Sequence, residues 1–113
     1  MSAVTTHMLD TAAGRPAAGV DVTLEQEVSG TWTLRGRGTT DDDGRVTELL
    51  PAEERPHAGT WRLSFDTGAW AAAQQRACFH PSITIAFVIE DPAQHYHVPV
   101  LWSPYGYSTY RGS

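Results

Sequence analysis

Short runs of alternating apolar and polar residues recur along the whole chain, separated by Gly, Pro and Asp. Alternation with a period of two is the pattern of β-strands that bury one face. Many short strands joined by such turns are typical of an all-β sandwich or barrel. The expected strands lie at residues 3–9, 20–28, 31–39, 45–48, 60–66, 82–90, 94–101 and 107–110. The pattern therefore predicts an all-β fold of seven or eight strands.

The faces of these strands define the expected core. The turn at Ser29-Gly30 joins two strands in a hairpin, whose second arm presents Trp32 and Leu34 to the core. The inward positions of the other strands are Val20, Val22, Leu24, Trp61, Leu63, Phe65, Tyr96, Val98 and Val100. The segment 82–90 is apolar on both faces, so we expect it to be buried on both sides or to pair with another subunit.

Other segments depart from the strand pattern. An Ala-rich stretch at 68–77 has Trp70, Ala73 and Ala77 at helical spacing, which predicts one short helix with Thr67 as its N-cap. Residues 10–19 and 49–59 are rich in Gly or Pro and are predicted to be irregular. Pro99 lies inside an expected strand, which indicates an edge strand or a bulge.

Composition narrows the class of protein. The 113 residues are 41% hydrophobic and 19% charged, which predicts one globular domain spanning residues 1–113. A formal net charge of −5 without any basic run argues against nucleic acid as a main partner. No apolar run has membrane-spanning length, and the opening residues do not resemble a secretory signal. One cysteine cannot form an internal disulfide, which fits a reducing compartment, so we expect a cytoplasmic protein. Since no apolar run could span a membrane, we also expect no membrane contact.

Histidine and arginine supply the candidate chemistry. His7 and His97 project from the strand faces opposite to the core, where apolar neighbours suggest cover by another subunit. Histidines held near an arginine such as Arg45 can perform acid–base hydrolysis of a polar substrate. His95 and His97 share a strand face, but zinc sites usually have three or four ligands, so we expect no metal site. Periodicity alone does not bring His7, Arg45 and His97 together.

Four motifs carry a resemblance to a known family. They are the opening TTHMLDTAAGRPAAGV, the central TTDDDGR, the block HYHVPVLWSPYGYSTY and the terminal YRGS. In this order they resemble the 5-hydroxyisourate hydrolases, the transthyretin-like enzymes of urate breakdown. The resemblance implies a transthyretin-like two-sheet β-sandwich with one short helix. It also implies a homotetramer, built as a dimer of dimers, with active sites at the dimer–dimer interface and no cofactor.

The resemblance further implies hydrolysis of 5-hydroxyisourate to 2-oxo-4-hydroxy-4-carboxy-5-ureidoimidazoline. By motif, the catalytic residues are His7, Arg45, His97 and Ser113. Substrate binding falls to His7, Arg45, Tyr110, Arg111 and Gly112, whereas His95 is expected to support His97. Either His7 or His97 can be the general base. The alternative is a non-catalytic transthyretin-like carrier of a small aromatic ligand, which needs neither the histidines nor the YRGS ending.

Overall fold

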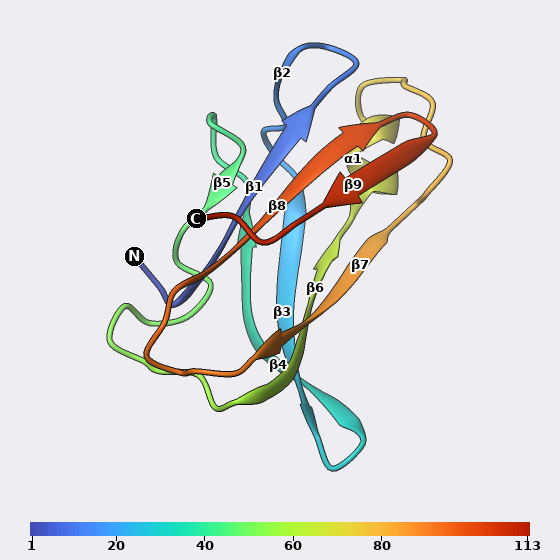
Figure 1. Cartoon of the computed structure of the whole chain (residues 1–113). Helices are drawn as coiled ribbons and strands as arrows, with labels where there is room; N and C mark the ends of the chain where they lie inside the picture. The colour runs from blue at the N-terminus through green and yellow to red at the C-terminus, as the bar shows by residue number, and fades with distance from the viewer.

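The computed structural model describes residues 1–113 and contains two β-sheets packed face to face (Figure 1). The strands are β1 (Val4–Asp10), β2 (Arg15–Pro16), β3 (Asp21–Val28), β4 (Thr31–Thr39), β5 (Arg45–Val46), β6 (Gly59–Phe65), β7 (Ile83–Ile89), β8 (Tyr96–Ser103) and β9 (Gly106–Thr109). The β1–β8 sheet has the order β2-β1-β8-β9, with β5 also paired to β1, and the β3–β6 sheet has the order β4-β3-β6-β7. One helix, α1 (Thr67–Ala72), precedes β7. The prediction of a two-sheet β-sandwich with one short helix is confirmed.

The first and the last long strands lie side by side in the β1–β8 sheet. β1 pairs with β8 in parallel, from Val4 opposite Tyr96 to Asp10 opposite Trp102, whereas the other strand pairs are antiparallel. Figure 1 shows the N- and C-terminal segments converging at one side of this sheet. Residues from opposite ends of the chain therefore become neighbours.

A single cluster of 21 buried apolar residues fills the space between the sheets. The inward positions predicted by alternation and found in this cluster are Val20, Val22, Leu24, Trp61, Leu63, Phe65, Tyr96, Val98 and Val100. The irregular segment before β6 adds Leu49 and Leu50, which are each 2% exposed. Burial of these side chains provides the main free energy that holds the two sheets together.

The inward placement of Trp32 and Leu34 was wrong. Between the pairs Leu24–Gly36 and Glu25–Leu34 the register shifts, so Arg35 is an extra residue in β4. One extra residue moves every preceding side chain of that strand to the other face of the sheet. Leu34 is accordingly 46% exposed, and Trp32 packs beneath the guanidinium of Arg62, 4.1 Å from its ring centre.

The helix is shorter than predicted and has a different cap. Asp66 is the N-cap and accepts a hydrogen bond from the backbone N–H of Ala69, while the Thr67 hydroxyl is buried and donates to the His80 carbonyl. The helix ends after Ala72, and Gln75 adopts a positive φ of 55°. No helix of the chain is long and apolar enough to cross a membrane.

Arg76 anchors the segment after the helix to the β1–β8 sheet. Its guanidinium donates to both carboxylate oxygens of Asp10, at 2.5 and 3.1 Å, and lies 5.0 Å from the ring centre of Trp102. The Asp10 carboxylate is 2% exposed and also accepts the backbone N–H groups of Ala12 and Ala13. Burial raises the pKa of Asp10, but the hydrogen bonds and the charge of Arg76 outweigh it, so the net pKa lies below its ordinary value.

The position of Pro99 needs correction, and one of the two alternatives for residues 82–90 is excluded. Pro99 was expected at an edge or a bulge, but β8 lies between β1 and β9. The Pro99 carbonyl accepts the Thr109 hydroxyl at 2.8 Å, so its ring nitrogen faces the same side, beyond the last paired residue of β9. The sheet therefore loses no ladder hydrogen bond to this proline. β7 is an edge strand and is not buried on both sides, because Ala86 and Val88 are exposed. The other alternative for this segment, pairing with another subunit, stays a prediction.

The Asp10–Arg76 pair generates the first prediction. Asp10→Asn leaves Arg76 without its counter-charge and should lower the free energy of unfolding at pH 7 by about 3 kcal/mol. Because the folded pKa of Asp10 is depressed, its contribution is present above the unfolded carboxyl pKa of about 3.9 and is lost as the pH falls through the folded pKa. Urea denaturation should thus show a smaller difference from wild type at pH 3 than at pH 7. Asp42→Asn, at an exposed turn position, is the control, and an equal difference at both pH values would contradict the assignment.

Candidate active site

The candidate site lies on the outer face of the β1–β8 sheet. Strand alternation turns Met8 and Val4 into the core and places Thr5 and His7 on the opposite face. The parallel register sets Thr5 opposite His97 in β8. Thr5 and His97 are 92 positions apart in sequence, yet they lie side by side on this face.

Arg45 reaches the same face through a glycine turn. Gly44 has a positive φ of 77°, and a Cβ there would meet the Met8 carbonyl oxygen at 2.3 Å. The Gly44 carbonyl accepts the Met8 N–H at 2.7 Å, and β5 then pairs Arg45 directly opposite His7. Residues directly opposite in an antiparallel pair point to the same face, so Arg45 and His7 lie side by side.

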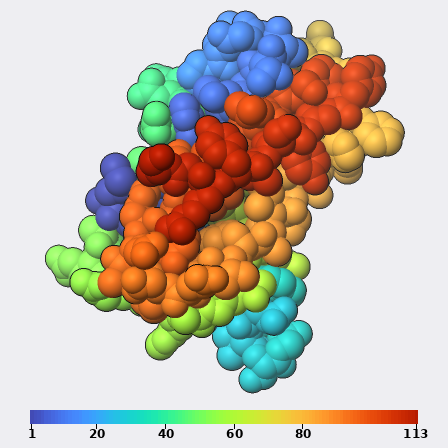
Figure 2. All heavy atoms as spheres, in the orientation of Figure 1, coloured from blue at the N-terminus to red at the C-terminus, as the bar shows by residue number.

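The chain end closes over β8. The backbone N–H of Gly112 donates to the His97 carbonyl at 2.8 Å, which extends the sheet by one bridge beyond β9. A Cβ at Gly112 would meet the His97 ring at 2.6 Å, so only glycine allows this close approach. Figure 2 shows the last residues packed beside the first ones on the surface.

A cavity of about 330 Å³ opens between these elements. Its lining residues are Met1, Thr5, Thr6, Arg45, Thr47, His95, His97 and Ser113. Three of the four predicted catalytic residues, Arg45, His97 and Ser113, thus surround one cavity. The fourth, His7, adjoins it through its pairing with Arg45 but is not among the lining residues.

The predicted substrate-binding residues of the tail are placed differently. Tyr110 and Arg111 line a second, mainly apolar groove of about 310 Å³ against β7. The Arg111 guanidinium lies 4.4 Å from the ring centre of Tyr96 and donates to the Gln94 side chain at 3.0 Å. Gly112 bonds to the His97 carbonyl through its backbone N–H. The structure brings Gly112 to the candidate site, but not the side chains of Tyr110 and Arg111.

Thr5 was missed by sequence reasoning. Its hydroxyl lies 2.8 Å from His97 Nδ1 and 3.0 Å from His95 Nε2, within hydrogen-bond distance of both rings. The only signal was its position on the same strand face as His7, two residues away. Threonine is common in strands for reasons of packing, so this signal does not separate a site residue from an ordinary one.

The surroundings of His97 favour its neutral form. Burial lowers the pKa of His97, and the positive charges of Arg45, His95 and His7 lower it further. A neutral imidazole at pH 7 can accept a proton, and His97 Nε2 has no hydrogen-bond partner within the chain. The cavity therefore combines a proton acceptor, a guanidinium and hydroxyl groups. No group of three or more His, Cys, Asp or Glu side chains is placed to hold a metal ion.

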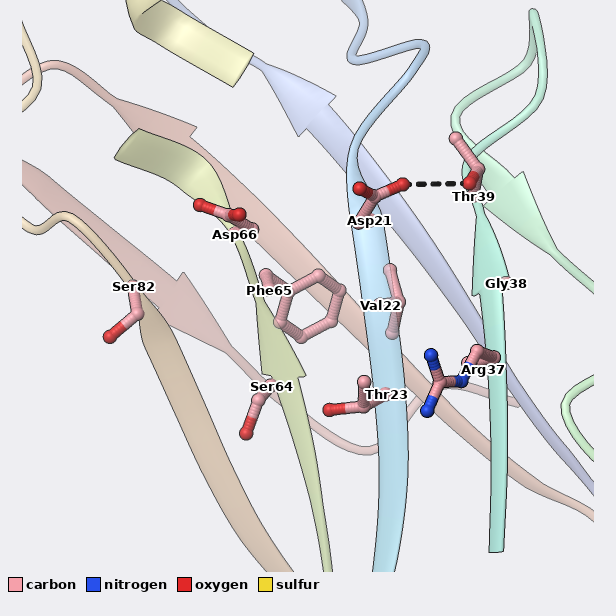
Figure 3. A pocket seen from close by; sticks show the side chains of 10 residues that line it. All are labelled: Asp21, Val22, Thr23, Arg37, Gly38, Thr39, Ser64, Phe65, Asp66 and Ser82. Carbon is pink, nitrogen blue, oxygen red and sulfur yellow. Dashed lines mark hydrogen bonds between the residues drawn. The ribbon is translucent and has the colours of Figure 1, made fainter. Parts of the chain in front are cut away.

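A larger hollow of about 490 Å³ lies on the outer face of the opposite sheet. Figure 3 shows its polar side chains spread over several strands, with Asp21 and Asp66 at one end and Arg37, Thr23 and Ser64 at the other. It contains no histidine, and the Asp21 carboxylate is already bonded to the Thr39 hydroxyl at 2.8 Å. Its groups do not converge on one point, so the smaller cavity is the better candidate.

Comparisons with known proteins agree with the motif resemblance. Residues 4–112 match the model of the HIUase/Transthyretin family. The 5-hydroxyisourate hydrolase of Salmonella dublin is 46% identical over 107 residues, which cover 95% of this chain and 78% of that protein. The structure of Klebsiella pneumoniae 5-hydroxyisourate hydrolase superposes with a TM-score of 0.86 at 38% identity, covering 100% of both chains. Sea bream transthyretin in complex with thyroxine superposes with a TM-score of 0.89 at 31% identity, covering 96% of this chain and 93% of that one. The chain therefore belongs to the HIUase/Transthyretin family, as its motifs predicted.

Proposed function

We propose that this protein hydrolyses 5-hydroxyisourate to 2-oxo-4-hydroxy-4-carboxy-5-ureidoimidazoline, opening a ring amide in urate breakdown. The observation that carries the proposal is the meeting of Arg45, His97 and Ser113 around one cavity, with His7 beside Arg45. These are the residues that the hydrolase motifs assign to catalysis. The names of the Salmonella dublin and Klebsiella pneumoniae relatives point to the same activity.

The geometry supports a division of roles among these residues. Nε2 of the neutral His97 takes a proton from water as the water oxygen attacks the amide carbon. Arg45 binds the carbonyl oxygen, on which negative charge develops in the transition state. The C–N bond then breaks as the leaving nitrogen takes a proton, for which His7, next to Arg45, is the available donor. The Ser113 hydroxyl binds the substrate, and the steps draw on no cofactor.

A carrier function is the competing proposal. Sea bream transthyretin, solved with thyroxine, shares the fold at 31% identity, so the architecture does not separate the two functions. The lining of the cavity does help to separate hydrolysis from a carrier function. Met1 is its one hydrophobic residue, and the others are His, Arg, Thr and Ser. An aromatic carrier site is expected to be mostly apolar. The polar lining supports hydrolysis.

Assembly into a homotetramer, a dimer of dimers in the cytoplasm, is part of the same proposal. Val88 on edge strand β7 is 57% exposed, and Phe79 and Tyr105 are 68% and 73% exposed. Large exposed apolar side chains and an open sheet edge are typical of surfaces that contact another chain.

The roles of the histidines can be tested with 5-hydroxyisourate made by urate oxidase. We expect His97→Asn to lower kcat by about 10²–10⁴-fold, the usual contribution of a general base, and His7→Asn to lower it less. The measurement is the ultraviolet decay of the substrate with and without each variant. His57→Asn, an exposed histidine outside the cavity, is the matched control. Wild-type rates in both site variants would refute the proposal.

The pH dependence of kcat/KM provides an independent test of the role of His97 as a base. A base must be deprotonated, so kcat/KM should fall as the pH drops through the lowered pKa of His97, below the ordinary histidine value of about 6.5. Arg45→Met removes a neighbouring positive charge, so it should raise the pKa of His97 and move this acidic limb of the pH profile to higher pH. It should also slow the reaction. Arg37→Met on the opposite sheet should leave the limb in place. A limb unmoved by Arg45→Met would contradict the electrostatic coupling.

The assembly can be tested by light scattering. Phe79→Glu places a charge on an exposed apolar position without touching the core, and we expect it to lower the mass from that of a tetramer while the unfolding transition stays close to wild type. Val28→Glu, at the far hairpin between β3 and β4, is the control with the same added charge. A monomeric wild-type protein would rule out the proposed assembly.

A further inference from the structure

One threonine hydroxyl joins two histidine rings. Thr5 is 3% exposed, and the hydroxyl contacts no polar group other than His97 Nδ1 at 2.8 Å and His95 Nε2 at 3.0 Å. The two rings stack with an interplanar angle of 15° and centroids 6.3 Å apart. His97 is half-buried and His95 is exposed. The hydroxyl thus links two rings of the cavity wall, of which His95 is the one exposed to solvent.

A hydroxyl carries a single proton, so Thr5 donates to one ring and accepts from the other. In the first arrangement His97 Nδ1–H donates to Thr5, and Thr5 donates to His95 Nε2. In the second arrangement His95 Nε2–H donates to Thr5, and Thr5 donates to His97 Nδ1. When both rings are neutral, they therefore share one tautomer, with the proton on Nδ1 in the first arrangement and on Nε2 in the second.

Conversion of the first arrangement into the second moves a proton across the group. His97 Nε2 gains a proton, its Nδ1–H bond breaks and a new O–H bond forms on Thr5. The original O–H bond of Thr5 breaks as His95 Nε2–H forms, and His95 Nδ1–H is released to water. Each bond that breaks is matched by one that forms, and the net charge of the three side chains is unchanged.

We infer that Thr5 is a proton relay, through which a proton accepted at His97 Nε2 leaves the site at the exposed ring of His95. Its role in turnover rests on the proposed hydrolysis. Opening a ring amide produces a carboxylic acid, which is ionised at neutral pH, so each turnover releases one proton. The relay carries one proton out at His95 when His97 takes a proton from water. The group returns to its first arrangement when His97 Nε2–H is given up on the substrate side and His95 Nδ1 takes up a proton from water.

The positive charges around His97 disfavour its protonated form, so a path that passes the proton on is useful there. Arg45 approaches from β5, His7 from β1 and His95 from the residue just before β8, while Arg111 in the tail donates to the His95 carbonyl at 3.4 Å. A lasting imidazolium at His97 would be partly buried among these groups, which agrees with its lowered pKa. The relay keeps His97 neutral in both arrangements, and Nε2 accepts the next proton once the group has returned to the first arrangement. His95 can carry a transient charge because it is exposed to water.

The kinetic test removes one link at a time. Thr5→Val keeps the shape of the side chain but lacks the hydroxyl, and His95→Ala removes the exit ring. We expect each to lower kcat by about tenfold, the low end for a lost proton-transfer group, and the double variant to lose no more than either alone. Thr5→Ser should retain most of the wild-type kcat, and His57→Ala should match wild type. Imidazole buffer should restore activity to His95→Ala, which a loss of packing would not allow.

The tautomers provide a test that needs no substrate. Nitrogen-15 NMR of the imidazole rings, assigned with His95→Ala, should show the same tautomer populations for His95 and His97 in the wild type and independent populations in Thr5→Val. Opposite tautomers in the wild type, or a wild-type kcat in His95→Ala, would overturn the relay. A wild-type protein that leaves 5-hydroxyisourate decay unchanged would instead overturn the proposed function, and the NMR result would still decide whether the rings are coupled.

Discussion

The parallel pairing of β1 with β8 is the constraint on which the rest of the structure depends. It joins strands from opposite ends of the chain over seven register pairs, from Val4–Tyr96 to Asp10–Trp102. Its inner face supplies Val4, Met8, Val98 and Val100 to the core, and its outer face sets Thr5 against His97. A shift of one residue would turn the histidines into the core, so burial of the inner face fixes the chemistry of the outer one.

Proteins with different functions share this sandwich fold, so the evidence for function lies in the side chains on the outer face of one sheet. A hydrolase and a thyroxine-bound transthyretin superpose on this chain with similar TM-scores of 0.86 and 0.89. The functional argument for this chain therefore rests on the side chains that line the cavity and on the glycine that lets the tail cross His97. The fold positions the site, but its residues carry the evidence for an activity.

Much of this could be predicted from the sequence, because burial of one strand face leaves a period of two that is visible without coordinates. The core positions of β3, β6 and β8 followed from it, as did the outward position of His97. The failure at Leu34 has a specific cause: one bulged residue, Arg35, reverses the faces of the strand before it, and no local pattern marks it. The role of Thr5 was equally hidden, since it depends on register between distant strands.

The positions of these residues determine the electrostatics of the candidate site. Gly44 and Gly112 bring Arg45 and the tail close to His97 by backbone contacts that larger residues would prevent. That proximity concentrates positive charge, and a histidine among such neighbours is held neutral and able to accept a proton. The same crowding would make a proton accepted there costly to retain. The hydroxyl of Thr5 joins His97 to the exposed His95 ring, so the crowded site has a neutral path for the proton that His97 takes from water.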